Sequence, residues 1–278
     1  MTAPARLTDG SVAWLRIRAV ARRHRFVLQR SPQRWFDVVV WPVVDAVLFG
    51  AIGVYFGEQA AKGGDNAAEA GAAFLLAGIV LFHVVFQAEI SLATGFMEET
   101  WSRNLLNIMV TPVKELEYAA GTVMFGLAKL AMGVGVVSLV AAAMFAFDIT
   151  SLGLALIPLV ALLLVVGWAV ALVVIGLILR VGQGAEILAW GFIALMMPLS
   201  GIFYPVSALP GVLQPIAQAL PTTHIFNAAR SVVAGDGLPW DEVAYAAIGA
   251  VVLSALSVWF LTRMLATFRK RGYISRHV

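Results

Sequence analysis

The chain has 278 residues, of which 61% are hydrophobic and only 13% are charged, and its formal net charge is +3. Soluble domains carry about 25% charged residues, so the composition excludes an ordinary soluble domain and indicates an all-α, polytopic integral membrane protein. The absence of cysteine excludes disulfides, thiolate metal sites and thiol catalysis.

Residues 1–34 are rich in arginine, and the stretch 11–30 has the pattern of an amphipathic helix. Its apolar half contains Trp14, Ile17, Val20, Ala21, Val27 and Leu28. Its polar half contains Arg16, Arg18, Arg22, Arg23 and Arg25, with Leu15 and Phe26 as exceptions. This pattern predicts a helix that lies on the inner leaflet of a membrane and ends before Pro32. The alternative is a basic segment that only fixes the topology.

Six apolar stretches are long enough to cross a membrane as helices, which takes about 20 residues each. They are residues 36–57, 71–94, 119–147, 153–179, 185–204 and 241–264. They define a transmembrane domain over 35–266, followed by a basic tail over 267–278.

The positions of the basic residues predict the orientation of these spans. All but three of the 19 lysines and arginines fall in the N-terminal segment, the loops after the second and fourth spans, and the C-terminal tail. Lys62, Lys129 and Arg230 are the exceptions. Basic residues concentrate in cytoplasmic loops, so both termini and the loop around residues 98–113 are predicted to be cytoplasmic.

Residues 98–113, EETWSRNLLNIMVTPV, form a polar interruption between the second and third spans. Trp101, Leu105, Ile108 and Met109 recur at roughly helical spacing, which predicts a short amphipathic helix that ends at Thr111-Pro112. Such a helix either docks on a soluble partner or lies in the membrane interface, and its pattern alone does not decide between these alternatives.

Ionisable residues also occur inside the predicted spans, where they are costly and usually face the interior of a helix bundle. Asp45, His83 and Lys129 lie near the middle of their spans, and Glu89 lies nearer the cytoplasmic end. Asp45 and Lys129 lie at a similar predicted depth, which predicts a structural pair. A proton relay is the alternative, with fewer residues to support it.

The stretch 205–226 is apolar enough to enter lipid, but proline recurs through it at Pro205, Pro210, Pro215 and Pro221. Each proline costs about 3 kcal/mol inside a helix, which excludes one continuous span. We expect two short helices within 205–223 that form a re-entrant element on the external face. A structural plug and an exit gate are both open as its role.

Motifs for catalysis and metal binding are missing from the sequence. It has no G-x-x-x-x-G-K-[ST] phosphate loop, no H-E-x-x-H motif and no pair of histidines at ligand spacing. An intramembrane serine protease is disfavoured, because Ser200 has Pro198 where a glycine would stand two residues earlier and His224 lies across the proline-broken loop. We therefore expect a chain that is not an enzyme and holds no metal or cofactor.

Two stretches resemble the ABC-2 family, the membrane subunits of ATP-binding-cassette exporters. Residues 98–121, EETWSRNLLNIMVTPVKELEYAAG, resemble the family's first cytoplasmic loop, with its glutamate-rich start and its Thr-Pro before the third span. Residues 195–236 resemble the second hallmark, with Pro-x-Ser-Gly, Tyr-Pro-Val, Leu-Pro-Thr-Thr and Asn-Ala-x-Arg. Family members often carry more charge at the start of the first loop than this chain does.

The resemblance implies roles for particular residues. Residues 98–110 would be a coupling helix seated on a separate ATPase subunit, which would bind ATP and Mg. The residues at this contact would be Glu98, Glu99, Trp101, Arg103 and Asn104. The stretch 205–223 would be the re-entrant gate. Two permease copies, forming a homodimer, would pair with two ATPase copies in a bacterial inner membrane, with lipid but no nucleic acid as a further partner.

The predicted function is therefore outward transport of an amphipathic substrate such as a drug, glycolipid or polysaccharide. Candidate pathway residues are Phe82, Phe86, Met196, Met197 and Phe203, for which ordinary core packing is the alternative. An ion-coupled secondary transporter and a non-transporting membrane scaffold or protease are the rival functions, and the former would show inverted repeats and several paired intramembrane charges.

Overall fold

The fold was obtained as a computed structural model, which describes residues 9–32, 35–62, 67–101, 107, 110–182, 184 and 186–271. Its regular elements within these ranges are all helical. They are α1 (Asp9–Arg30), the π-helix η1 (Phe36–Val40), α2 (Trp41–Lys62), α3 (Ala67–Trp101), α5 (Glu115–Phe145), the 3₁₀ segment η2 (Ile149–Ala155), α6 (Leu156–Val181), α7 (Glu186–Leu199), the 3₁₀ turn η4 (Val206–Ala208), α8 (Gln214–Gln218), α9 (Pro221–Ala234) and α10 (Trp240–Arg271).

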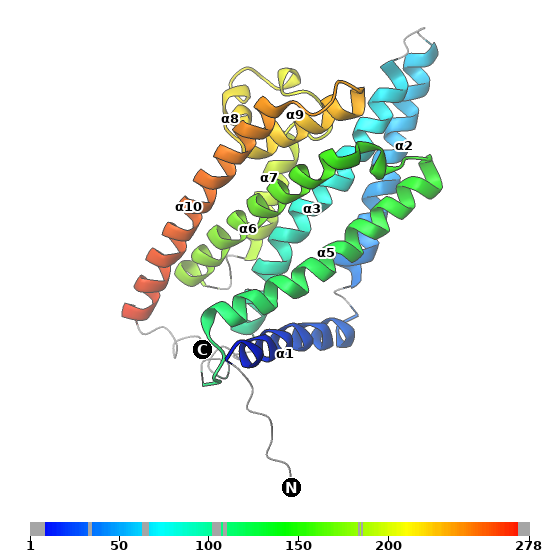
Figure 1. Cartoon of the computed structure of the whole chain (residues 1–278). Helices are drawn as coiled ribbons and strands as arrows, with labels where there is room; N and C mark the ends of the chain where they lie inside the picture. Colours follow the sequence, from blue (N-terminus) through cyan, green and yellow to red (C-terminus); the bar gives the residue numbers. More distant parts are fainter. Residues whose placement is uncertain are drawn as a thin grey trace.

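Helix α3 is the centre of the bundle (Figure 1). It packs against α2, α5, α6, α7 and α9, while α10 packs against α6 and α9. Nearly every residue between Phe74 and Ile90 is buried, and a helix that is apolar on all sides is expected in such a position. By contrast, α2 and α10 keep large apolar side chains exposed on their outer faces, as lipid-facing helices do.

Five helices in the described residues are long and apolar enough to cross a membrane. Their apolar stretches are Val38–Tyr55, Ala73–Glu99, Ala120–Phe145, Leu152–Val181 and Trp240–Thr267. The fold is thus an all-α, multi-pass membrane protein. The predicted fifth span, 185–204, corresponds to the shorter helix α7, because Pro198 occupies its last turn and Gly201 follows at φ +66°.

Residues 205–234 are rich in proline and form what we call the cap. The cap closes the end of the bundle opposite α1 (Figure 1). Pro205 precedes η4, Pro215 lies in the first turn of α8 and Pro221 begins α9. Proline is tolerated at these positions because the first turn of a helix has no internal partner for its N–H groups. The regular part of this region extends to Ala234, beyond the 205–223 range predicted from the prolines.

The cap is held by short polar contacts in otherwise apolar surroundings. Ser200 and Thr222 share a hydrogen bond of 2.6 Å between their hydroxyls, and Thr223 Oγ1 donates to Ala217 O at 2.5 Å. On α9, Arg230 donates to Gly201 O at 3.0 Å and lies over the ring of Phe74 of α3 at 4.3 Å. These contacts tie the cap to α3 and α7.

A close backbone approach in the core joins α3 to α6. A Cβ added at Gly167 would lie 2.6 Å from Ala88 Cβ and 2.7 Å from Val85 O, so there is no space for a side chain. Gly135 of α5 has no neighbouring atom within 4 Å of the same position. The two glycines therefore form a matched pair for a test of this packing.

We predict that Gly167→Ala separates α3 from α6 and destabilises the protein by about 1–3 kcal/mol, the usual cost of overpacking a core. The unfolding midpoint of the detergent-solubilised protein measures this change. Gly135→Ala should leave the midpoint unchanged or raise it slightly, because alanine favours helix. Equal midpoints for Gly167→Ala and the unaltered chain would contradict the packing described.

Candidate functional site

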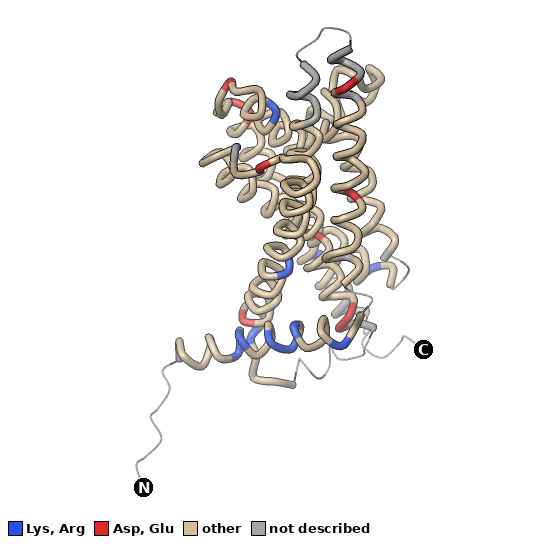
Figure 2. The backbone as a smooth tube through the Cα atoms, turned by 90° about the vertical axis from the view of Figure 1, so that its right-hand side faces the viewer, with Lys and Arg blue, Asp and Glu red and all other residues tan. Residues whose placement is uncertain are grey.

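Helix α1 lies across one end of the bundle and carries most of the arginines there (Figure 2). The helix predicted over 11–30 is present, but its apolar side does not face lipid alone. Val20, Ala21 and Leu28 are buried, and α1 packs mainly against α5. Trp14, Leu15 and Phe26 stay exposed.

Close contact between α1 and α5 depends on Gly121. A Cβ at this position would lie 2.6 Å from Val20 Cβ and 2.7 Å from Ile17 O. Only glycine lets the two helices approach this closely, because any side chain would collide with the backbone of α1. The α1 residues at the contact are fixed by packing as well as by charge.

Two ion pairs join α1 to α3 and α5. Arg16 Nη1 lies 3.3 Å and 3.4 Å from the two carboxylate oxygens of Glu117 on α5. Arg23 pairs with Glu99 near the end of α3, and the Glu99 side chain is only 1% exposed. Breaking such a pair from the arginine side is costly, because it leaves a carboxylate buried without that partner.

Glu117 also fixes the start of α5. The backbone N–H of Lys114 donates to its Oε2 at 2.9 Å, which satisfies one of the free donors at the helix start. This hydrogen bond, and then the charge of Arg16, hold the pKa of Glu117 below its ordinary value of 4.5. The carboxylate is therefore ionised at neutral pH and binds α1 to the first turn of α5.

His24 provides a third polar contact between α1 and α5. The Thr122 hydroxyl donates to Tyr118 O at 3.1 Å, so its oxygen is left to accept from His24 Nε2 at 3.4 Å. The imidazole also stacks on Phe125, with ring centroids 5.6 Å apart. We call the set Arg16, Val20, Arg23, His24, Glu99, Glu117, Gly121 and Thr122 the α1 junction.

The α1 junction holds both ends of the segment that connects α3 to α5. Glu99 lies two residues before the end of α3 at Trp101, and Glu117 lies two residues after the start of α5 at Glu115. A force applied to the connecting segment would therefore move α1, α3 and α5 together.

Some of the predicted contact residues belong to this region. Glu98 and Glu99 lie on the last turns of α3, and Glu98 is half-buried. Trp101 is the last residue of α3, but its side chain, Arg103 and Asn104 lie outside the described residues, as does most of the predicted helix 98–110. Sequence reasoning placed Arg16 and Arg23 on the polar half of this helix without a partner, and it did not single out Glu117. The seven-residue spacing of the two arginines, which places them on one face of α1, was the available signal.

The predicted gate prolines differ in their surroundings. Pro205, Pro210 and Pro215 are exposed, while Pro221 is buried against α10. A Cβ added at Gly249 would lie 3.0 Å from Pro221 Cβ. How deeply this segment enters a membrane, and whether it acts as a gate, stay predictions.

Asp45 lies beside His83, with 3.5 Å between Oδ2 and Nε2. Lys129 is buried on α5. Gly133, one turn after Lys129, faces Val38 of η1, which precedes Asp45 of the following helix α2 by two turns. This register offsets Asp45 and Lys129 by about 16 Å along the bundle and gives no support to a direct pair.

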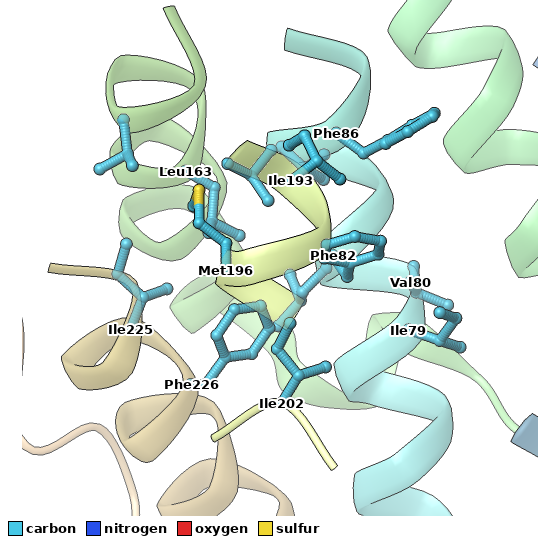
Figure 3. Packing of buried hydrophobic residues seen from close by; sticks show 14 of the residues in the cluster. Ile79, Val80, Phe82, Phe86, Leu163, Ile193, Met196, Ile202, Ile225 and Phe226 are labelled. Carbon is cyan, nitrogen blue, oxygen red and sulfur yellow. The ribbon is translucent and has the colours of Figure 1, made fainter. Parts of the chain in front are cut away.

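Among the predicted pathway residues, Phe82, Phe86 and Met196 are buried in the core of the single chain (Figure 3). They pack with Leu163, Ile193, Ile202 and Phe226 from α6, α7, the turn after it and α9. Met197 and Phe203 are partly buried against the same core. Core packing thus accounts for their positions within one chain, and a role in a transport pathway stays a prediction.

Comparison with known protein families gives the class of this membrane protein. The family model described as "ABC-2 type transporter" matches residues 16–234, which include most of α1, the connecting segment and the cap. The chain therefore belongs to the ABC-2 type transporter family. It is a membrane permease component of an ABC transporter, the non-catalytic part that works with an ABC ATPase subunit. A search among curated proteins gave no match.

The lowered pKa of Glu117 predicts a pH-dependent contribution to stability. The contact with Arg16 and Lys114 is fully present above the ordinary pKa of 4.5 and is lost as the pH falls through the lower folded-state pKa. We expect the unaltered protein to unfold at a higher temperature than Glu117→Gln at pH 7, and the difference to shrink towards pH 3. A difference that did not change with pH would contradict this role.

Proposed function

We propose that this chain couples ATP hydrolysis by a separate ATPase subunit to outward translocation of an amphipathic substrate. The observation that carries the proposal is the α1 junction, which binds both ends of the segment where an ATPase would dock. Glu98, Glu99, Trp101, Arg103 and Asn104 are the proposed contact residues. ATP and Mg would be held by the partner.

The packing of α3 supports a mechanical route from this segment through the bundle. A displacement of the connecting segment reaches α3 through its last turns and reaches α5 through Glu117. Because α3 also contacts α2, α6, α7 and α9, its movement would change the packing of the whole bundle, including the cap. Packed interiors transmit displacement because they have little free volume.

The proposed topology has six crossings and a cytoplasmic α1 end. The position of α1 and the last turns of α10 at the same end of the molecule in Figure 1 supports an even number of crossings. Helix α7 leads from the end of α6 back towards α8 and α9, and with residues 200–204 it would form the short fifth crossing. The cap would then be external and would form the re-entrant gate.

The proposed assembly contains two permease copies and two ATPase copies in a bacterial inner membrane. The exposed apolar faces of α2 and α10 offer area for a second copy in addition to lipid. A seam between two identical copies would give an amphipathic substrate a path that the core of one chain, filled by residues such as Phe82 and Met196, does not offer.

Charge reversal at the connecting segment tests the coupling role. We predict that Glu98→Arg with Arg103→Glu lowers the amount of ATPase that co-purifies with the permease from membranes by about tenfold, the scale expected for lost charge complementarity at an interface. Asp236→Arg, at an exposed position beyond the cap, should leave the yield unchanged. Full recovery of an active ATPase with the double variant would argue against this docking site.

A further inference from the structure

A carboxylate in the membrane-spanning part of α2 faces partly outward. Asp45 lies near the middle of the apolar stretch Val38–Tyr55, and its side chain is 26% exposed. Its neighbours on the outer face of α2, Val44 and Leu48, are 46% and 51% exposed. The carboxylate can therefore be reached from outside the single chain at the depth of the lipid tails.

Lipid is an unsuitable neighbour for this group. An aspartate at the centre of a spanning helix costs about 2.5–3.5 kcal/mol when it faces hydrocarbon. Such residues usually face a bundle interior, a water-filled cavity or an ionic partner. The outer face of α2 around Asp45 is thus expected to face something other than lipid.

His83 lies beside the carboxylate but leaves the bonding capacity of that carboxylate free. The imidazole is 1% exposed, and its Nδ1 lies 2.9 Å from Ile79 O. Because a carbonyl oxygen only accepts, Nδ1 carries a proton and donates it. In the neutral ring Nε2 then has no proton to donate, and it lies 3.5 Å from Asp45 Oδ2, which is also long for a hydrogen bond. A carboxylate has about four acceptor sites, so Asp45 can take a further cationic donor.

Aromatic rings lie on both helices next to this acid, one turn away on α2 and around His83 on α3. Phe82 and Phe86 contact the His83 ring, with centroids 6.1 Å and 6.0 Å away. One turn after Asp45, Phe49 stacks on Phe203 at 4.1 Å, and Phe86 also contacts Trp190 of α7. Phe49 lies four residues after Asp45 on the same helix face, and a carboxylate next to an aromatic ring is a combination that recognises organic cations.

We propose that Asp45, which lies beside His83, binds the cationic head of the transported substrate, and that this substrate is an amphipathic amine or quaternary ammonium compound. The proposal rests on the function proposed above and narrows its substrate class. An anionic glycolipid or a polysaccharide phosphate does not fit, because it would place a second negative charge beside Asp45. The apolar part of the substrate would lie along the exposed face of α2.

The test uses the permease with its ATPase in lipid nanodiscs and two fluorescent probes. One probe is an alkyl-trimethylammonium dye, and the other is the same dye with an uncharged hydroxyl in place of the ammonium group. We expect Asp45→Asn to weaken binding of the cationic probe by about tenfold or more, the scale for losing one charge pair, and to leave binding of the neutral probe unchanged. Asp45→Glu should retain most of the affinity for the cation.

The possible results separate this proposal from the proposed function. Equal losses for both probes would overturn it, because they would make Asp45 a structural residue only. Unchanged cation binding in Asp45→Asn would overturn it too. If the complex hydrolyses ATP but binds neither probe, the cationic substrate class is wrong while the coupling role stands. Failure of the permease to retain any ATPase would instead contradict the proposed function.

The matched control variant is Asp148→Asn. Asp148 lies in the turn between α5 and η2, and this variant should bind both probes normally.

Discussion

The attachment of α1 to the ends of α3 and α5 is the interaction on which the rest of the account depends. Arg23 with Glu99 secures the last turns of α3, and Arg16 with Glu117 secures the first turn of α5. Gly121 removes the side chain that would keep α1 and α5 apart. Charge alone at such a partly exposed site would be weak, and packing alone would not fix the rotation of α1. Together they make three helices one unit.

The rest of the bundle is arranged so that movement of this unit has consequences elsewhere. Helix α3 is buried along most of its length and contacts the helices that support the cap. At the far end, Arg230 joins α9 to Phe74 near the start of α3. The same helix thus runs from the α1 junction to the cap. The outer faces of α2 and α10 remain apolar and exposed, with Asp45 as a charged exception.

Much of the fold could be predicted from the sequence, because apolar runs and prolines are local signals. The long spans, the N-terminal helix and the broken segment after α7 follow from hydropathy, arginine spacing and proline chemistry. The ends of α7 and the extent of α9 were missed, since hydropathy alone does not show the turn at Gly201 and α9 continues to Ala234, beyond the proline-rich stretch. The pairing of ionisable residues was also beyond the sequence. It depends on helix register, which placed His83 and not Lys129 beside Asp45, and which matched Arg16 to a glutamate 101 residues away.

The central claim, that α1, α3 and α5 move as one unit when the ATPase acts, is open to a direct distance measurement. The chain has no cysteine, so pairs of spin labels can be attached without background. One pair joins Gly10 on α1 to Leu139 on α5, and the other joins Leu139 to Val251 on α10, all at exposed positions. When ATP is trapped on the partner subunit, the first distance should stay constant while the second changes. A change in the first distance with the second constant would contradict the account.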